Sequence, residues 1–506
     1  MKRVALALAV VGALVIAVPA ATANDSSVGT QGAAIRPLAD TDIRMDSEAV
    51  QIICMRDYAL YRIDFKFVNE SDTEKAIKLG FPFPDFENTE DGNRGDSPAA
   101  FGAWLNGAEL EVKQERGFDT DGEAEWPVVW FTREAVFPPG ESMVTVSYIG
   151  SPDSSVMGSH IYEALSLPPD SPGIVGYYPY LVHTGAGWAG PIGTTVVRYV
   201  LADDFNGSRV DDVMEAEASA EWVTPERARH FRSFTKPAPN VYQWVYTDYE
   251  PTLDHDPRLA FLYESEWSPS FDPYTDTVAS SWLALGDYQY PPYNIRDGRP
   301  SDAWAEAVDG PGIGEWIDIP FSETREVREV RVVPGYQKRS DLFLKYNRPS
   351  SLKIEFSDGT TVDLPLADAM GLQTFAVNAR AESAKVTILG VYPGTNERDE
   401  TYISEITFAE AAAPKFSTFE AVTGIAPPDA FEEPEPLAQL TDTSSGGPAA
   451  GDDMVAEPTA GEARTGLVVA LALVVLGVAA AGAAVVLKRK AGQMASDGPG
   501  EPHGQA

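Results

Sequence analysis

The chain has 506 residues, and its 76 acidic side chains outnumber the 38 basic ones for a formal net charge of −38. This length exceeds what one hydrophobic core supports, so it predicts two or more domains. The acidity argues against nucleic acid as a partner, because phosphate contacts need a basic surface. The single cysteine, Cys54, cannot form an intrachain disulfide, and its apolar neighbours predict a buried thiol.

Residues 1–23 have the pattern of a signal peptide. Lys2 and Arg3 form a charged start, residues 4–18 are apolar, and residues 21–23 fit a small-x-small cleavage site. An uncleaved anchor is the alternative. Residues 24–40 are small and polar, which predicts a flexible leader.

Residues 41–263 are expected to form an N-terminal β-rich domain of unknown function, followed by a linker at 264–277. Four apolar side chains alternate with charged ones between Tyr61 and Phe67, which is the period of a half-buried strand with its charges in solvent. Proline- and glycine-containing turns separate further runs of this kind. The pattern is typical of an antiparallel β-sandwich.

A glycine motif at 185–190 satisfies the dinucleotide-binding spacing G-x-G-x-x-G. That mechanism needs a helix N-terminus directly afterwards, aimed at the pyrophosphate. Here Pro191 and a β-branched run at 194–200 follow, which predicts a strand and no nucleotide site. We interpret His183, just before the motif, as a hydrogen-bonded structural residue, with a catalytic base as the alternative.

The sequence shows no catalytic constellation, so we expect a protein that is not an enzyme and has no catalytic residues. The motifs H-E-x-x-H, G-x-S-x-G and C-x-x-C and a P-loop are all missing from the sequence. Asp254-His255-Asp256 is interpreted as loop decoration, with cation binding as the alternative. Paired carboxylates of a glycoside hydrolase stay open, because spacing alone cannot locate them in so acidic a chain.

Residues 278–410 are expected to form a second β-sandwich or jelly roll. Leu352, Ile354 and Phe356 alternate with charged residues, a turn follows at 357–360, and Val362 and Leu364 return. This is the pattern of a β-hairpin. The fold class predicted for the whole chain is therefore all-β, with two β-sandwich regions.

A series of short motifs in the second region resembles the discoidin-like (F5/8 type C) family. The closest subgroup precedes bacterial NAD glycohydrolases and is described as a glycan-binding or translocation domain. The motifs are Asn294, Asp297, Gly298 and Trp304, then residues 312–317, 335–338, 347–348, 356–359, 391–394 and 403–406. The resemblance implies a discoidin-like jelly roll at 278–410.

The first region resembles a family of exported bacterial proteins known as the domain of unknown function 4424. The matching pieces are residues 45–50, 80–82 and 184–192. This resemblance implies no activity.

The discoidin-like resemblance implies a glycan site on two loops. Tyr336 or Tyr346 would stack on a sugar ring, while Lys338, Asn347 and Arg348 would donate hydrogen bonds. In the alternative reading, the tyrosine rings pack on strand ends and Arg348 pairs with Asp341.

The same resemblance implies a structural Ca²⁺ as the one cofactor to consider. The matching positions are Asp297, Asp302 and Glu405, whose hard oxygen atoms suit this ion. Arg299 departs from the family pattern and would weaken such a site. In the alternative reading, Asp297 and Glu405 cap turns and pair with basic groups.

The C-terminal part is predicted to anchor the protein. Residues 411–465 are rich in small and acidic residues and predict a disordered stalk. Residues 466–487 carry no charge and are long enough for a transmembrane helix. Lys488-Arg489-Lys490 then predicts that the tail, 488–506, is cytoplasmic.

These expectations combine into a single-pass bacterial membrane protein with an extracellular ectodomain. Its discoidin-like domain would bind carbohydrate or an envelope polymer without catalysis. The alternatives are an envelope scaffold or protein-interaction role, and then an exported hydrolase. Ligand identity, the role of the N-terminal domain and the oligomeric state stay open at this point.

Overall fold

The computed structural model of the chain describes most of residues 26–442. The described residues are 26–27, 32–33, 35–39, 41–84, 98–121, 124–156, 159–167, 174–202, 209–221, 223–263, 276–285, 288–395, 398–434 and 441–442. The predicted signal peptide, transmembrane helix and cytoplasmic tail lie outside these residues, as does most of the linker. Within them, every helix is too short or too polar to cross a membrane.

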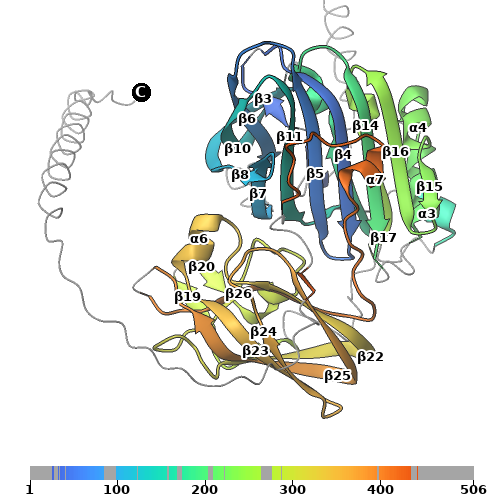
Figure 1. The fold of residues 1–506 in the computed structure, drawn as a ribbon. Coiled ribbons are helices and arrows are strands. Elements are labelled where there is room, and N and C mark those ends of the chain that lie inside the picture. The colour runs from blue at the N-terminus through green and yellow to red at the C-terminus, as the bar shows by residue number, and fades with distance from the viewer. Residues whose placement is uncertain are drawn as a thin grey trace, which may run out of the picture. The chain divides into compact units, whose positions relative to one another are not determined.

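The N-terminal domain is built from three β-sheets in which most neighbouring strands are antiparallel (Figure 1). The largest has the strand order β15-β16-β14-β4-β5-β11-β7-β8, and a four-stranded sheet has the order β3-β6-β10-β9. The third joins β1, β12, β13 and β17, with β2 beside β13. The bounds are β1 (Ser26–Ser27), β2 (Gly32–Ala33), β3 (Arg36–Pro37), β4 (Arg44–Cys54), β5 (Ala59–Asn69), β6 (Lys75–Pro84), β7 (Ala99–Leu105), β8 (Ala108–Glu109), β9 (Lys113–Asp121), β10 (Ala124–Phe137), β11 (Gly140–Gly150), β12 (Asp153–Val156), β13 (Ile174–Leu181), β14 (Ile192–Leu201), β15 (Thr235–Ala238), β16 (Val241–Tyr249) and β17 (Arg258–Tyr263).

Short helices complete this domain. They are α2 (Ser159–Leu165), η2 (Val182–Gly187), α3 (Val210–Ala218), α4 (Pro225–Phe231) and η4 (Leu253–His255). The glycine motif lies around the end of η2 and is followed by strand β14, as predicted. His183 donates its backbone N–H to one carboxylate oxygen of Asp256, and its Nδ1 lies 2.6 Å from the other. The structural interpretation of His183 agrees with these contacts.

Strand β5 shows how the alternating pattern becomes a two-sided sheet. Tyr61 and Phe67 point into the sandwich core, where Cys54 is also buried. The charged residues of the same strand face the other way, and the sequence predicts them in solvent. They are nevertheless buried, because residues from the far end of the chain cover that face of the sheet.

The covering segment comprises residues 411–434, which we call the strap. Its helix α7 (Phe419–Thr423) packs over β4 and β14 (Figure 1). Phe419 and Val422 bury their side chains against Ala49, Met143 and Val196. The prediction of a disordered stalk is therefore wrong for residues 411–434. The strap has enough apolar surface to offset its chain entropy because the sheet supplies the other half of the contact.

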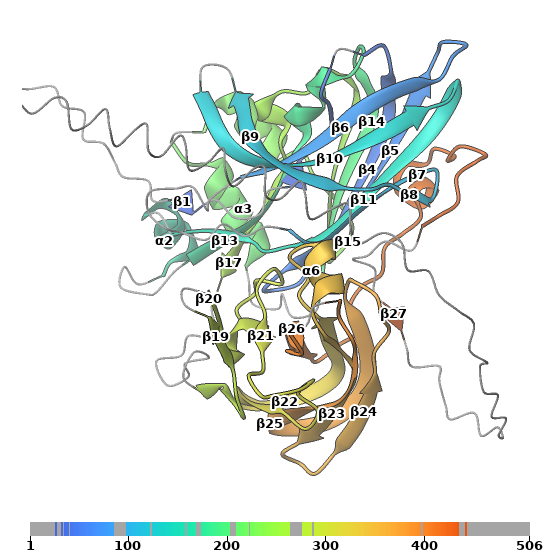
Figure 2. The ribbon, with the colours of Figure 1, turned by 90° about the vertical axis from the view of Figure 1, so that its left-hand side faces the viewer.

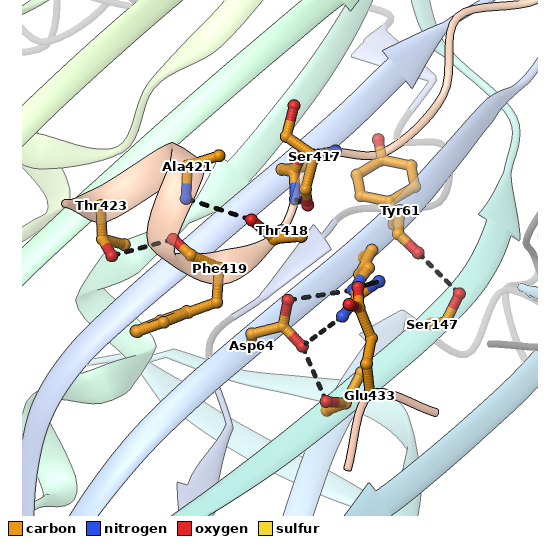
Figure 3. Close-up of polar contacts among 12 residues, drawn as sticks. Tyr61, Asp64, Ser147, Ser417, Thr418, Phe419, Ala421, Thr423 and Glu433 are labelled. Atoms are coloured by element: carbon orange, nitrogen blue, oxygen red, sulfur yellow. Dashed lines mark hydrogen bonds and ion pairs between the residues drawn. The ribbon is translucent and has the colours of Figure 1, made fainter. Parts of the chain in front are cut away.

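Polar contacts fix the strap in register on the sheet (Figure 3). The Gln51 side chain donates to the carbonyl oxygen of Ser417 at 2.7 Å and accepts from its backbone N–H at 2.8 Å. Arg62 donates through Nη1 to Glu433 at 2.7 Å. The Thr418 side chain caps the start of α7 by accepting from the Ala421 N–H.

The predicted flexible leader is also partly wrong. Ile35 is fully buried in the core of the N-terminal domain, and β3 pairs with β6. The indole of Trp188 donates a hydrogen bond to the carbonyl oxygen of Ile35. Residues 35–39 are held because their backbone pairs with β6 at the edge of the sheet and the Ile35 side chain is buried in the core.

The second domain is a β-sandwich built on two long strands, β22 and β25 (Figure 2). Its main sheet has the order β21-β26-β22-β25-β23-β24, and β19 pairs with β20. The predicted hairpin is present as β23 and β24. The elements are β18 (Val278–Ala279), β19 (Leu283–Leu285), β20 (Tyr288–Tyr290), η5 (Pro292–Ile295), β21 (Trp304–Ala305), β22 (Trp316–Pro334), α6 (Ser340–Lys345), β23 (Arg348–Phe356), β24 (Thr361–Pro365), β25 (Gln373–Tyr392), β26 (Tyr402–Ala409) and β27 (Thr441–Asp442).

The two β-rich regions belong to one compact unit and share an apolar cluster. The Ala100 N–H donates to the carbonyl oxygen of Gln337, and the Ser151 hydroxyl donates to that of Gly298. The turn that opens the second domain therefore contacts the first. The fold of the second domain and its contacts with the first domain together position the loops that carry the predicted site residues.

Candidate carbohydrate-binding site

Four tyrosines of the second domain form one aromatic cluster, which we call the tyrosine cluster. Tyr402 is buried at its base, and Tyr290, Tyr336 and Tyr346 are half-buried around it. The Tyr336 ring stacks on Tyr402, with centroids 5.5 Å apart and planes 11° apart. The Tyr346 and Tyr290 rings lie 4.6 Å and 5.2 Å from the Tyr402 ring. The structure thus brings Tyr336 and Tyr346 together, as the predicted site requires.

Separate elements position these rings. Tyr402 begins β26, Tyr290 ends β20, and Tyr346 follows α6 with its N–H bonded to the Leu342 carbonyl oxygen. Tyr336 follows Gly335, whose φ of 75° is a conformation that favours glycine. A side chain at that glycine would also collide with Phe343 of α6.

The cluster combines apolar ring faces with basic groups at its edge. The Lys345 ammonium lies 5.0 Å from the Tyr346 ring centroid, and Lys338 is half-buried two residues after Tyr336. Burial raises the pKa of Tyr336 and of Tyr402 well above the ordinary tyrosine value. The hydroxyls are therefore neutral at physiological pH and can both donate and accept hydrogen bonds.

Asn347 and Arg348 do not have the binding roles predicted for them. The Asn347 side chain donates to the Asp399 carbonyl oxygen and accepts from the Gly394 N–H. Arg348 is buried, and its Nε and Nη2 bind the two carboxylate oxygens of Asp368. Both side chains hold loops together through hydrogen bonds within the chain, and Arg348 also contacts the carbonyl oxygen of Tyr346, so they help to position the tyrosine cluster. The alternative pairing of Arg348 with Asp341 is wrong, because Asp341 pairs with Arg339 and the partner of Arg348 is Asp368.

The three residues predicted to hold calcium meet different environments. Asp297 accepts the Arg299 N–H and so caps its own turn. Glu405 is almost fully buried, and its Oε2 has no hydrogen-bond partner in the structure. Burial, followed by the charges of Asp297 and Asp57, raises the pKa of Glu405 well above its ordinary value. Asp302 is half-buried and also contributes charge to this region.

Across the described residues, no group of three histidine, cysteine or acidic side chains is arranged to hold a metal ion. Asp297, Asp302 and Glu405 therefore do not meet as a coordination shell here. The calcium expectation has no geometry to rest on and stays a prediction.

Sequence reasoning missed Tyr290 and Tyr402, which complete the cluster. Tyr290 lies 46 residues before Tyr336, and Tyr402 lies 56 residues after Tyr346. Spacing along the chain carries no signal for such a meeting. Trp304 is fully buried, while Trp316 is half-buried and its ring centroid lies 4.3 Å from the Lys385 ammonium.

These features define the second domain as a discoidin-like β-sandwich with an aromatic cluster. Residues 270–409 match the family model described as the NAD glycohydrolase translocation F5/8 type C domain. Residues 23–124 match the model of a domain of unknown function, DUF4424. Both predicted resemblances are confirmed. No protein with a curated description matches the chain.

Several solved structures are similar to the second domain. A family 32 carbohydrate-binding module from C. perfringens NanJ, in complex with galactose, is 14% identical, with 26% of this chain and 89% of that chain covered at a TM-score of 0.21. The family 32 carbohydrate-binding module from Streptococcus pneumoniae EndoD is 12% identical. The match covers 28% of this chain and 100% of that chain, with a TM-score of 0.21. The Streptococcus pyogenes NAD⁺-glycohydrolase translocation domain is 17% identical. The match covers 20% of this chain and 91% of that chain, with a TM-score of 0.17. At such low scores these are similarities only.

Proposed function

We propose that the discoidin-like domain binds carbohydrate without catalysis, through the tyrosine cluster. The observation that carries the proposal is the set of three half-buried rings, Tyr290, Tyr336 and Tyr346, held around buried Tyr402. A pyranose ring offers an apolar face that packs on an aromatic ring, while its hydroxyls need polar groups at the rim. Phenolic hydroxyls and the nearby lysines supply such groups.

Rigidity supports a binding role for the cluster. Its rings come from strand ends and from the end of a helix, and Arg348 and Asn347 brace the adjoining loops. A pre-formed site loses little conformational entropy when ligand binds. A protein-interaction role for the same surface is the second candidate, because tyrosine is also enriched in protein interfaces.

Retention of the purified full chain on a cell-wall polysaccharide column tests this proposal. Tyr346→Ala should weaken binding roughly tenfold, the size of a typical hot-spot truncation. Trp282→Ala removes an exposed aromatic side chain of the same domain that lies outside the cluster, and it should leave retention unchanged. Equal retention of wild type and Tyr346→Ala, with an unchanged melting temperature, would exclude the cluster as the sugar site.

We also propose that the chain is exported and held in the membrane by residues 466–487, with its domains outside the cell. The basis is the uncharged length of this segment and the three basic residues that follow it. Protease added to intact cells should then degrade the two domains and spare a tag placed at the C-terminus. Full protection of both domains would contradict this topology.

A further inference from the structure

The interior of the N-terminal domain contains an arginine that has no acidic partner among the residues that the structure describes. Arg133 lies on the inward face of β10 and is 2% exposed. Its Nη1 donates to the carbonyl oxygen of Phe131 at 3.3 Å. Its Nε and Nη2 are buried and have no hydrogen-bond partner within the described part of the chain. A buried cation with two unsatisfied donors is costly, so it requires an explanation.

The open edge of Arg133 is the edge that other arginines of this chain use for carboxylates. In four of them, Nε and Nη2 donate in parallel to the two oxygens of one acidic side chain. These pairs are Arg62 with Asp64, Arg232 with Glu215, Arg339 with Asp341, and Arg348 with Asp368. This geometry is the strong bidentate form of the arginine–carboxylate contact. Arg133 has the same two donors, but no acidic side chain among the described residues accepts from them.

An aromatic ring lies near the Arg133 guanidinium, and further rings pack against that ring. The Arg133 guanidinium lies 5.9 Å from the Phe101 ring centroid. Phe101 in turn lies 4.5 Å from Phe131 and 5.8 Å from Tyr148, measured between ring centroids. Phe101 is half-buried, so part of its side chain contacts solvent. These aromatic rings would suit the apolar part of a ligand.

Two further polar groups of the same aromatic cluster are unsatisfied. The hydroxyls of Tyr61 and Tyr148 are buried and have no hydrogen-bond partner in the structure, and their rings stack 4.5 Å apart. Burial holds the pKa of both phenols well above the ordinary value, so they remain neutral donors. Burial lowers the pKa of Arg133 to about 9, and the guanidinium therefore still carries its charge at neutral pH.

We propose that the interior of the N-terminal domain binds an apolar molecule with one carboxylate, and that Nε and Nη2 of Arg133 receive the carboxylate. Two parallel donors match the two oxygens of a carboxylate. The phenylalanine rings exclude water from the rest of the ligand. The site is distinct from the tyrosine cluster and does not depend on the function proposed for it.

Calorimetric titration of the purified full chain with octanoate, and separately with 1-octanol, tests the proposal. The acid should bind at least roughly tenfold more tightly than the alcohol, because only the acid forms the charged pair. Arg133→Met should weaken octanoate binding roughly 10- to 100-fold and leave 1-octanol unchanged. Arg116→Met, which removes an exposed arginine from the neighbouring strand β9, is the matched control and should change neither.

Two results would overturn the proposal. One is a wild-type protein that does not prefer octanoate, which would mean that only buried water satisfies Arg133. The other is an Arg133→Met variant that binds octanoate as tightly as wild type. If this variant fails to fold, Arg133→Lys keeps the charge but cannot supply two parallel donors, so it should still lose about tenfold. Unweakened binding by Arg133→Lys would also contradict the assignment.

Discussion

Two buried arginines of the N-terminal domain differ in their hydrogen-bond partners. Arg62 lies on the outer face of the large sheet, and Arg133 lies in the interior. On the outer face, Arg62 is 2% exposed, and Asp64 and Glu433 accept from all three of its guanidinium nitrogens. In the interior, Arg133 is equally buried but has a partner for Nη1 only. Arg62 is buried because the strap covers it and brings an acid with it. The comparison shows that the chain itself supplies acceptors for all three nitrogens of Arg62, whereas Nε and Nη2 of Arg133 have no acceptor among the described residues.

The largest effect is expected where the completed pair is broken. Arg62→Met leaves the carboxylate of Asp64 buried, with only the Thr145 hydroxyl as a donor. Removing one partner of a buried ion pair typically costs about 3–5 kcal/mol. The midpoint of urea unfolding should therefore fall sharply. The double variant Arg62→Met with Asp64→Asn should recover part of the loss, and an unchanged midpoint in the single variant would show that the pair contributes nothing.

A smaller effect, with a defined pH window, is expected from Glu48 in the interior. Burial raises its pKa from 4.5 to about 7, although hydrogen bonds from Tyr180 and Thr195 act in the opposite direction. Between these two values the folded state holds the proton more tightly than the unfolded chain. The free energy of unfolding contributed by Glu48 should therefore fall as the pH rises from 4.5 to 7, by about 3 kcal/mol.

The comparison with Glu48→Gln isolates this contribution, because both proteins share the remaining acidic groups. The difference in unfolding free energy between wild type and variant should shift in favour of the variant as the pH rises through the window. A difference that is independent of pH would mean that Glu48 titrates as an ordinary carboxyl group.

The smallest effect concerns the attachment of the strap. Gln51→Ala removes both hydrogen bonds to the backbone of Ser417, which should cost about 1–3 kcal/mol of strap docking. Trypsin should then cleave after exposed Lys415 roughly 10- to 100-fold faster, since local opening exposes the strap to protease. Glu420→Gln changes an exposed residue of α7 and serves as the control. Equal cleavage rates in wild type and Gln51→Ala would show that Gln51 does not hold the strap.

Part of the candidate site could be predicted from the sequence, and part could not. Tyr336 and Tyr346 were found because they lie in loops that resemble a known family. Tyr290 and Tyr402 pack against them from distant segments, and nothing local marks them. The assignment of Arg348 to ligand binding failed because charge and family position do not reveal that Asp368 already occupies its guanidinium.

The strands could be predicted from the sequence, because the alternation of apolar and polar side chains is a local property. The period of two in β5, the hairpin of β23 and β24, and the strand after the glycine motif all follow from it. The tertiary structure alone decided which faces are buried. Gln51 and Ser417 meet across 366 positions, and only that meeting turns the charged face of β5 into an interior. Burial depends on partners that the local pattern does not record, and for Arg133 the open donors indicate a partner from outside the chain.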